Sequence, residues 1–236
     1  TSTDLKEAKA LALELDQTNK ERKEIQEETV AEAESLFCRD VDIKKDRVIV
    51  LASEIFHPGV IGIAASRLVD KYHRPTVLIA LEAGQGKGSG RSIPKFNLFK
   101  GFTNCSEHLI QFGGHAYAAG LSIKEDQVEA FRDAMNEVGH RHLTEEDLIP
   151  EVRMDTELSI EGIDRSLYSR MALLEPFGAE NPVPSFLSRG VKMQEVKRIG
   201  KEKNHVRFRA QQGKGRIEGV GFGMAEVFES VDTTTE

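Results

Sequence analysis

Two short apolar runs on either side of an amphipathic segment constrain this chain more than any other feature. The runs are "RVIVLA" (47–52) and "TVLIAL" (76–81), and each is long enough for one buried strand. The segment between them carries apolar residues at helical spacing: Val60, Ile61, Ala64, Leu68 and Val69. Two strands joined through a helix form a βαβ unit, which places the strands parallel in one sheet. The sequence therefore predicts an α/β fold.

A long helix is predicted before this unit, over residues 4–37. Asp4 and Glu7 fit a capping box, and apolar residues recur near both ends of the segment. Its centre, "DQTNKERKE", is polar on all sides, as in helices that bridge two bodies through solvent. An ordinary surface helix fits the same pattern, and both interpretations stay open.

The remaining chain divides near "LTEEDLIP" (143–150). Before it we predict helices near 97–111 and over 126–142, with a strand ending "GGHAYAAGLSI". After it, short strands and turns indicate a small β-barrel. The predicted parts are a connector helix (1–46), a mixed α/β domain (47–150) and a barrel-like domain (151–236). The predicted barrel strands are 152–160, 185–200, 204–212 and 215–223, with a helix over 166–178.

Composition excludes several classes of protein. The 236 residues are 30% charged, and no apolar run approaches the roughly 18 residues of a membrane span, so we expect no membrane partner. The two cysteines form no CxxC motif, which favours a reducing cytosol. Because the chain begins with Thr1, we expect it to be part of a longer protein.

The net charge of −7 hides two basic stretches. Residues 83–106 contain no Asp or Glu, and residues 189–216 carry a net charge of +8. In the first, "GKGSGRSIPKFN" (86–97) is neither a P-loop nor a Rossmann fingerprint. Its glycines nevertheless suit backbone anion binding, and Ser89, Gly90, Arg91 and Ser92 offer donors for phosphate oxygens. We interpret it as a phosphate-binding loop, with a flexible turn between strands as the alternative.

Two further segments are candidates for phosphate contact. In "GGHAYAAG" (113–120), Gly113 and Gly114 permit close backbone approach and His115 can donate to an anion. A tight turn with a core histidine remains the alternative. His57 in "HPG" precedes a predicted helix N-terminus, where anions are favoured, although it also fits a simple capping turn.

The second basic stretch is a candidate surface for a single nucleic-acid strand. Charged grooves with aromatic platforms hold single strands in small barrels, and the alternative is a solvated strand face. The candidate residues are Lys197, Arg198, Lys203, His205, Arg207, Phe208 and Arg209, of which Arg207 and Arg209 share one strand face. The sequence has no HExxH, GxSxG or CxxC motif, so we predict no metal site and no catalytic residue within it.

Four segments together resemble the C-terminal half of the RecJ single-stranded-DNA exonuclease family. They are "FHPGVIGIAASRLVDKYHRPTVLIA", "GKGSGRSI", "FGGHAYAAGLSI" and "LEPFGAENPVP". The first three resemble the DHH-associated domain, and the last resembles the segment leading into the RecJ OB-fold.

The resemblance implies a 5′→3′ exonuclease of bacterial cytoplasm that acts in DNA repair and recombination. Mg²⁺ or Mn²⁺ would be held by an N-terminal DHH domain that this chain lacks, so the chain alone should be inactive. Single-stranded DNA would lie between that domain and the associated domain, with His57, Ser89–Ser92 and Gly113–His115 facing its phosphates. An OB-like domain would guide the strand, and its final strands would be missing after Val231.

Two other functions fit the same motifs. One is a DHH-superfamily phosphodiesterase that acts on short oligonucleotides or cyclic dinucleotides. The other is a non-enzymatic nucleic-acid-binding module. The basic stretch after residue 150 favours the exonuclease, because phosphodiesterases with small substrates do not need it.

Overall fold

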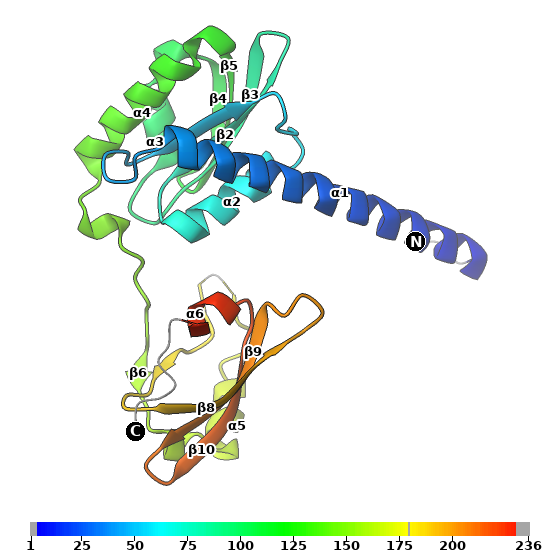
Figure 1. Cartoon of the computed structure of the whole chain (residues 1–236), viewed down its shortest axis with the longest axis vertical. Coiled ribbons are helices and arrows are strands. Elements are labelled where there is room, and N and C mark those ends of the chain that lie inside the picture. The colour runs from blue at the N-terminus through cyan, green and yellow to red at the C-terminus, as the bar shows by residue number, and fades with distance from the viewer. Residues whose placement is uncertain (1–3, 179, 230–236) are drawn as a thin grey trace. The chain divides into compact units, whose positions relative to one another are not determined.

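The computed structural model describes residues 4–178 and 180–229 (Figure 1). The chain divides into two compact units between Pro150 and Glu151. None of the helices among the described residues is long and apolar enough to cross a membrane.

The predicted βαβ unit is confirmed in the first unit. Strand β1 (Ile49–Ser53) lies parallel to β2 (Thr76–Glu82), and α2 (Ile61–Tyr72) connects them. Strands β3 (Gln85–Arg91), β4 (Leu109–Gly114) and β5 (Ala118–Lys124) extend the sheet through antiparallel pairs, in the order β1-β2-β3-β5-β4. The result is a mixed five-stranded sheet.

Each face of this sheet has its own apolar core. On one face, α2 and the C-terminal half of α1 (Leu5–Asp40) cover β1 and β2, burying residues such as Leu51, Leu68 and Leu78. On the other, α3 (Leu98–Asn104) and α4 (Val128–His142) cover the sheet around Phe102 and Phe131. The first cover stops at β3, so the same face of β5 and β4 is bare of helices (Figure 1).

The glycine-rich stretch is a strand and not the predicted loop. Its glycines alternate toward the α3–α4 core, where neighbouring side chains occupy the space of a Cβ atom. A Cβ on Gly86 would lie 2.5 Å from Ile79 Cγ2, and one on Gly88 would lie 2.7 Å from Leu121 Cδ1. Close packing against these side chains, and not approach to a ligand, explains the glycines of β3.

The helix predicted near 97–111 is also shorter than expected. Helix α3 ends at Asn104, a 3₁₀ turn follows at Ser106–His108, and the chain then enters β4, which sequence reasoning missed. Pairing with β5 draws the segment into the sheet as its edge strand.

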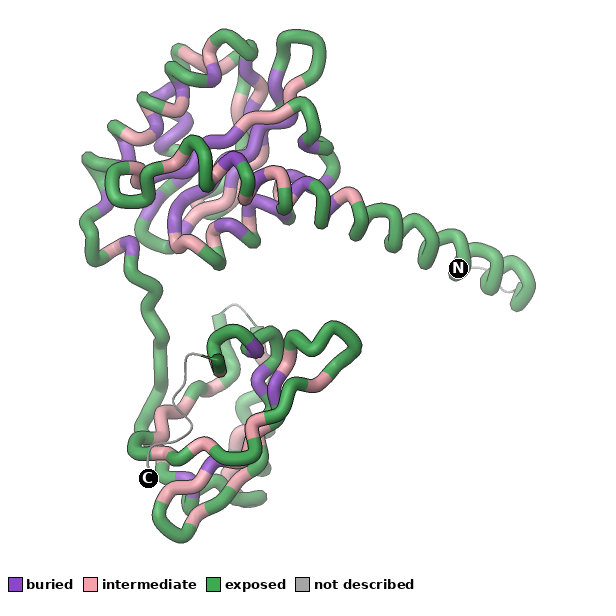
Figure 2. Tube along the Cα trace, viewed as in Figure 1, coloured by how far each residue is buried: buried purple, intermediate pink, exposed green. Residues whose placement is uncertain are grey.

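The long N-terminal helix is confirmed, with a longer C-terminal end than predicted. Asp4 caps it by accepting a 2.8 Å hydrogen bond from the Lys6 backbone amide. Every residue from Leu5 to Glu24 is exposed, and burial begins only in the C-terminal half (Figure 2). The apolar stripe predicted near the start is therefore uncovered in this chain.

The second unit is a small, sparsely buried β-structure. Strands β8 (Lys192–Ile199), β9 (His205–Gln212) and β10 (Gly215–Gly221) form an antiparallel sheet, as predicted. The strand predicted over 152–160 is reduced to β6 (Thr156–Glu157), which pairs in parallel with β7 (Phe186–Leu187). The helices are α5 (Arg165–Ala172), shorter than predicted, and α6 (Ala225–Glu229).

Within residues 151–178 and 180–229 these strands form two separate sheets and no closed barrel. Buried apolar side chains are few in this unit: Ile160, Val206, Ala210 and Ala225. The strands expected to be missing after Val231 concern residues outside the described part of the chain.

Candidate nucleic-acid interface

Three aligned residues form the floor of the first candidate surface. Ser89 on β3 pairs with Gly120 on β5, and Gly120 pairs with Gly113 on β4. Residues directly opposite one another in antiparallel strands share a face, and this row runs from Ser89 beside α2 onto the part of β5 and β4 that α2 does not cover. A Cβ on Gly113 would meet nothing within 4 Å, and one on Gly120 would meet only Gly88 O at 3.6 Å. We call Ser89, Arg91, Gly113 and Gly120 the open sheet face.

Arg91 and Ser89 lie against the first turn of α2. A Cβ on Gly62 would lie 2.7 Å from Arg91 Nη2 and 3.0 Å from Ser89 Oγ, so both side chains pack closely against this turn. No side chain caps this helix start at Val60. The Val60 and Ile61 amides donate to His57 O instead. A guanidinium, a hydroxyl and a helix N-terminus therefore gather in one place, which favours an anion.

The contacts of Arg91 leave its charge uncompensated. Arg91 Nη1 donates to Ser89 Oγ at 3.1 Å and to Gly90 O at 2.8 Å, and both acceptors are neutral. Among the described residues it forms no ion pair. Ser89 Oγ accepts this bond, so its own proton is available to a ligand.

His57 lies beside the same helix start. Its Nδ1 accepts a 3.0 Å hydrogen bond from the Gly59 amide, so the neutral ring carries its proton on Nε2. The ring lines a cavity of about 590 Å³ together with Lys87 and Ser122 from the open side of the sheet. Glu54 and Glu82 also line this cavity, which makes it less favourable to anions than the Arg91 site.

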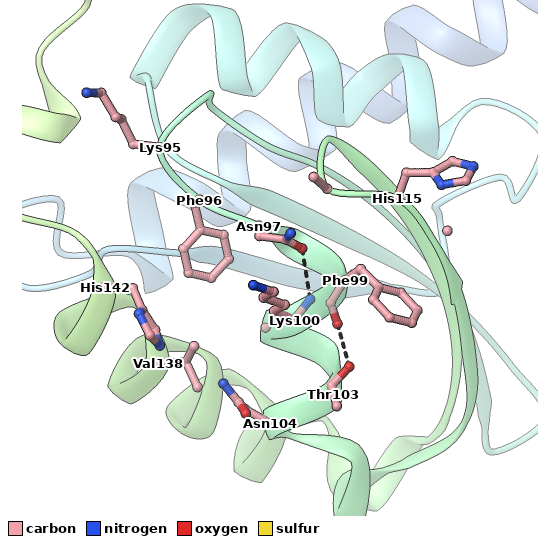
Figure 3. Close-up of a pocket in the computed structure, with 13 residues that line it drawn as sticks. Lys95, Phe96, Asn97, Phe99, Lys100, Thr103, Asn104, His115, Val138 and His142 are labelled. Atoms are coloured by element: carbon pink, nitrogen blue, oxygen red, sulfur yellow. Dashed lines mark hydrogen bonds between the residues drawn. The ribbon is translucent and has the colours of Figure 1, made fainter.

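The GGH segment ends β4 and begins the hairpin to β5. Gly114 has φ +140°, and a Cβ there would lie 2.5 Å from Ala118 O, so only glycine fits. His115 follows in the turn, where its amide donates to Ala118 O at 2.8 Å. Its side chain is exposed, contrary to the alternative of a core histidine. It projects at the edge of a second cavity, on the α3 side (Figure 3).

Two predicted residues do not join this surface. Gly90 faces the core, where a Cβ would lie 2.7 Å from Leu98 Cδ2. The Ser92 hydroxyl donates to Phe96 O at 2.7 Å and closes the turn after β3. The structure thus brings together Ser89, Arg91, Gly113 and the start of α2, but leaves these two in structural contacts.

The second candidate surface is the solvent side of β9, which carries His205, Arg207 and Arg209. We call it the Arg207 face. Its arginines share one side of the strand as predicted, but both are already paired with carboxylates. Arg207 Nη2 lies 2.6 Å from Glu218 Oε2, and Arg209 pairs with Glu195 and, at 3.5 Å, with Glu218. The neighbouring arginines hold the pKa of Glu218 below its ordinary value, with the Arg207 hydrogen bond as the largest cause.

A β-bulge brings one of these carboxylates into place. The β8–β9 register shifts between Gln194 and Lys197, and Glu195 within it has φ +51°. Bulges re-aim side chains, and this one directs Glu195 to Arg209. Sequence reasoning missed Glu195 and Glu218 as partners, because the pairing depends on strand register.

Phe208 does not lie among the arginines. Strand alternation turns it to the other side, where it stacks on Phe228 with ring centroids 5.2 Å apart. The aromatic neighbour of the Arg207 face is instead Phe222, which is 76% exposed. The centroids of the Phe222 and His205 rings lie 5.4 Å apart. His205 Nδ1 also accepts a 2.8 Å bond from the Gly223 amide.

The other predicted cations are spread over both sides of this sheet. Lys197 lies opposite Arg207 on the same face, whereas Arg198 lies opposite Val206 and pairs with Glu229. Lys203 stands in the β8–β9 turn with φ +53°. The stretch is therefore not one continuous basic face.

The metal implied by the resemblance does not fit the described residues. No group of three or more His, Cys, Asp or Glu among residues 4–178 and 180–229 is placed to hold a metal ion.

Two domain-family models match the chain. Residues 45–140 match the DHHA1 domain, and residues 154–236 match the RecJ OB domain. Together these two matches cover most of the chain, and the DHHA1 match precedes the RecJ OB match along the sequence.

Proteins named as RecJ are similar over most of the chain. The single-stranded-DNA-specific exonuclease RecJ of Bacillus subtilis is 38% identical over 98% of this chain, which spans 29% of that protein. RecJ of Thermus thermophilus is 34% identical over 87% of this chain and 29% of its own length.

Solved structures agree with these matches. Crystal structures of RecJ from Thermus thermophilus in complex with Mg²⁺ and with Mn²⁺ superpose with TM-scores of 0.71 and 0.72. Both are 30% identical and cover 94% of this chain but only 36% and 34% of theirs. The chain thus combines a DHHA1 domain with a RecJ OB domain and is similar to the C-terminal part of RecJ exonucleases.

Proposed function

We propose that this chain is the substrate-binding half of a single-stranded-DNA exonuclease. It spans about a third of the relatives that it matches, so the nuclease activity belongs to a longer protein. Its parts would be a connector helix (1–46), a DHHA1 domain (47–150) and an OB domain (151–236).

One observation carries the proposal: on the open sheet face, the Arg91 guanidinium has no carboxylate partner among the described residues and lies beside strand backbone that carries no side chains at Gly113 and Gly120. A phosphate at Arg91 would also meet the Ser89 hydroxyl and the first turn of α2, the last of which favours negative charge. Because Gly113 and Gly120 present no side chains, the strand's backbone could pass close to the sheet across β5 and β4. His115 at the end of β4 would contact a neighbouring phosphate.

The Arg207 face would hold a more distant part of the strand. Arg207 and Arg209 would exchange their carboxylates for phosphates, and a base would stack on Phe222 beside His205. Two separate strand-binding surfaces suit a long strand better than a short oligonucleotide or a cyclic dinucleotide.

The catalytic step would take place outside this chain. RecJ structures contain Mg²⁺ or Mn²⁺, and we propose that the full-length protein uses one of these ions, held by its N-terminal domain. The protein would act in the bacterial cytoplasm in repair and recombination, from the 5′ end of the strand.

Binding of labelled oligothymidylate, with a 5′-phosphate or a 5′-hydroxyl, tests this function. We expect Arg91→Ala to weaken binding by about ten- to a hundredfold, the range for a hydrogen bond to a charged group. The control is Arg153→Ala, which removes one exposed arginine from the interdomain segment. Equal affinity of both variants for both oligonucleotides would refute the phosphate site.

Incubation of the purified chain with Mn²⁺ and the same oligonucleotides tests the division of labour. We expect binding without cleavage. Cleavage by the chain alone would show that its own residues complete a nuclease site.

A further inference from the structure

The second half of the acid-free window takes no part in the proposed function. Residues 83–91 supply the open sheet face, but residues 93–106 run on to the opposite face of the sheet, where α3 packs. There they line a cavity of about 750 Å³ whose lining also includes the β4–β5 hairpin and the last turn of α4. We call it the α3 cavity.

The lining of this cavity carries cationic and no acidic side chains. Lys95 and Lys100 line it together with His115 and His142, and no Asp or Glu does so. Figure 3 shows Lys95 and His142 toward one end, His115 at the other and Lys100 between them. Side chains that can donate hydrogen bonds to an anion thus recur along the cavity, and two of them are lysines.

Neither lysine is already engaged by a carboxylate. Lys95 and Lys100 form no side-chain hydrogen bond or ion pair with another described residue, unlike Arg47, Lys71 and Arg132 of the same unit. The Asp147 carboxylate already accepts hydrogen bonds from the Thr144 amide at 2.9 Å and from the Thr144 hydroxyl at 2.8 Å, and these bonds are the main cause of its lowered pKa. The charge of Lys95 makes a minor contribution to the lowered pKa of Asp147. Both ammonium groups are therefore available to an anion.

The neutral lining suits a base. Phe99 is 39% exposed at the cavity and offers part of its ring for stacking. The Asn104 side-chain amide also lines the cavity without a hydrogen-bond partner among the described residues, so it can pair with a base edge. The volume lies within the range of small-ligand sites, about 300–1,000 Å³.

We infer that the α3 cavity binds a nucleotide unit, with its phosphate at Lys100 in the middle of the cavity, Lys95 as a second cation at one end, and its base near Phe99 and Asn104. The unit is either a free nucleoside monophosphate or part of a strand. His115 lies at the hairpin edge that separates this cavity from the open sheet face, so a strand could reach both.

Equilibrium dialysis with the 236-residue chain tests the inference. The probes are deoxyadenosine monophosphate, adenosine, inorganic phosphate and oligothymidylate with a 5′-hydroxyl. The test variant is the double substitution Lys95→Ala with Lys100→Ala. The matched control is Lys9→Ala with Lys23→Ala, which removes two exposed lysines from α1. Thermal melts check that both variants fold, as expected for exposed side chains.

We expect the double variant to bind the monophosphate or the oligonucleotide about tenfold more weakly, because charge-assisted phosphate contacts are strong. Loss of monophosphate binding identifies a free nucleotide as ligand, and loss confined to the oligonucleotide identifies the strand. Phe99→Ala should weaken the monophosphate more than inorganic phosphate. If the double variant and its control bind every probe alike, the inference is wrong. An effect of Lys95 and Lys100 without an effect of Arg91→Ala would refute the proposed open-face site and leave this one standing.

Discussion

Two basic surfaces of this molecule are similar in sequence and different in electrostatics. On the open sheet face, Arg91 contacts only the neutral Ser89 hydroxyl and a backbone carbonyl. On the Arg207 face, both arginines are paired with Glu195 and Glu218. In the stretch with a net charge of +8, ion pairs therefore offset part of the positive charge that the composition suggests. In the acid-free window, by contrast, Arg91 forms no ion pair with a described residue.

An added carboxylate on the open sheet face should have the largest effect. Gly120→Asp places a negative charge in the row with Ser89 and next to the Arg91 site. At about 4 Å, like charges repel by roughly 1–4 kcal/mol in water-exposed surroundings, so oligothymidylate binding should weaken about tenfold or more. Fluorescence anisotropy with a labelled oligonucleotide measures it.

Gly120→Asn is the matched control, because it has the same shape without the charge. We expect it to bind more tightly than Gly120→Asp. Equal weakening by both would show that steric blockage and not charge matters on this face.

The two sides of the sheet should also differ in their tolerance of a methyl group. Gly88→Ala adds a Cβ 2.7 Å from Leu121 Cδ1 in the core, and such overpacking costs about 1–3 kcal/mol of unfolding free energy. Gly113→Ala adds one to open space and should leave stability within about 0.5 kcal/mol. Urea denaturation of both variants checks this, and equal destabilisation would contradict the assignment of the two faces.

Removing a competing carboxylate should strengthen the weaker surface. Glu218→Gln takes the negative partner from Arg207 and from one side of Arg209. Exposed ion pairs are worth about 0.2–1 kcal/mol, so oligonucleotide affinity should rise by up to about fivefold. Glu226→Gln removes an exposed acid from α6 and serves as control. Unchanged affinity of Glu218→Gln would show that this face does not bind the strand.

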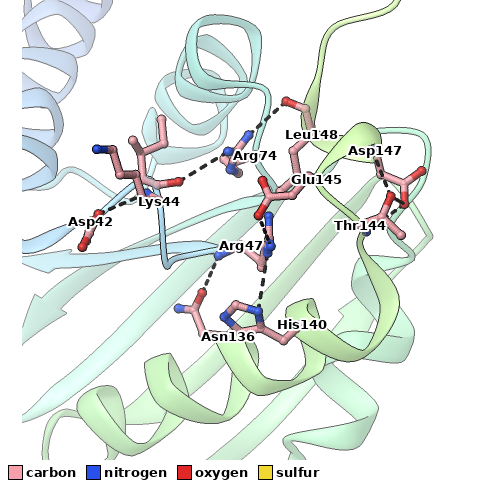
Figure 4. A network of polar contacts seen from close by, with 11 residues as sticks. Asp42, Lys44, Arg47, Arg74, Asn136, His140, Thr144, Glu145, Asp147 and Leu148 are labelled. Atoms are coloured by element: carbon pink, nitrogen blue, oxygen red, sulfur yellow. Dashed lines mark hydrogen bonds and ion pairs between the residues drawn. The ribbon is translucent and has the colours of Figure 1, made fainter.

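Acidification should act on a third region, the segment after α4 (Figure 4). Arg47 pairs with Glu145 and lowers the pKa of that carboxyl below its ordinary 4.5, chiefly by a hydrogen bond, while Arg74 donates to Leu148 O at 3.0 Å. A depressed folded-state pKa stabilises the fold above the ordinary value, and this contribution is lost as pH falls through the folded value.

The melting temperature should therefore fall as pH drops below about 4.5, and less so in Glu145→Gln than in wild type. Glu137→Gln on α4 is the control and should follow wild type. Identical pH profiles for wild type and Glu145→Gln would show that this pair does not stabilise the fold.

Apolar pattern predicted much of this fold. The βαβ unit, α4 and the β8–β10 sheet were all visible as runs or periodic residues, because their burial is set by their own side chains. Strand β3 was not, because its glycines have no apolar pattern and its packing depends on Ile79 and Leu121 from neighbouring strands. Strand β4 was hidden for a related reason: its edge pairing with β5 is a tertiary contact.

The sequence indicated several residues of the candidate site, but it did not predict which side chains would lie together or which would be paired. Strand alternation alone could have separated Phe208 from Arg207 and Arg209. The pairing of Glu218 with Arg207 could not have been found, since it requires the β9–β10 register. Likewise, nothing in the sequence linked Gly62 to Arg91, which the βαβ packing brings together.

The salt dependence of oligothymidylate binding by Arg91→Ala and Arg207→Ala tests the central claim most directly. Each phosphate contact on a single strand contributes about 0.7 to the slope of log affinity against log salt. We predict that Arg91→Ala lowers the affinity and reduces the slope by about 0.7, the value for one phosphate contact. Arg207→Ala should change both quantities less, because Glu218 already offsets the charge of Arg207. A larger loss for Arg207→Ala than for Arg91→Ala would contradict the account.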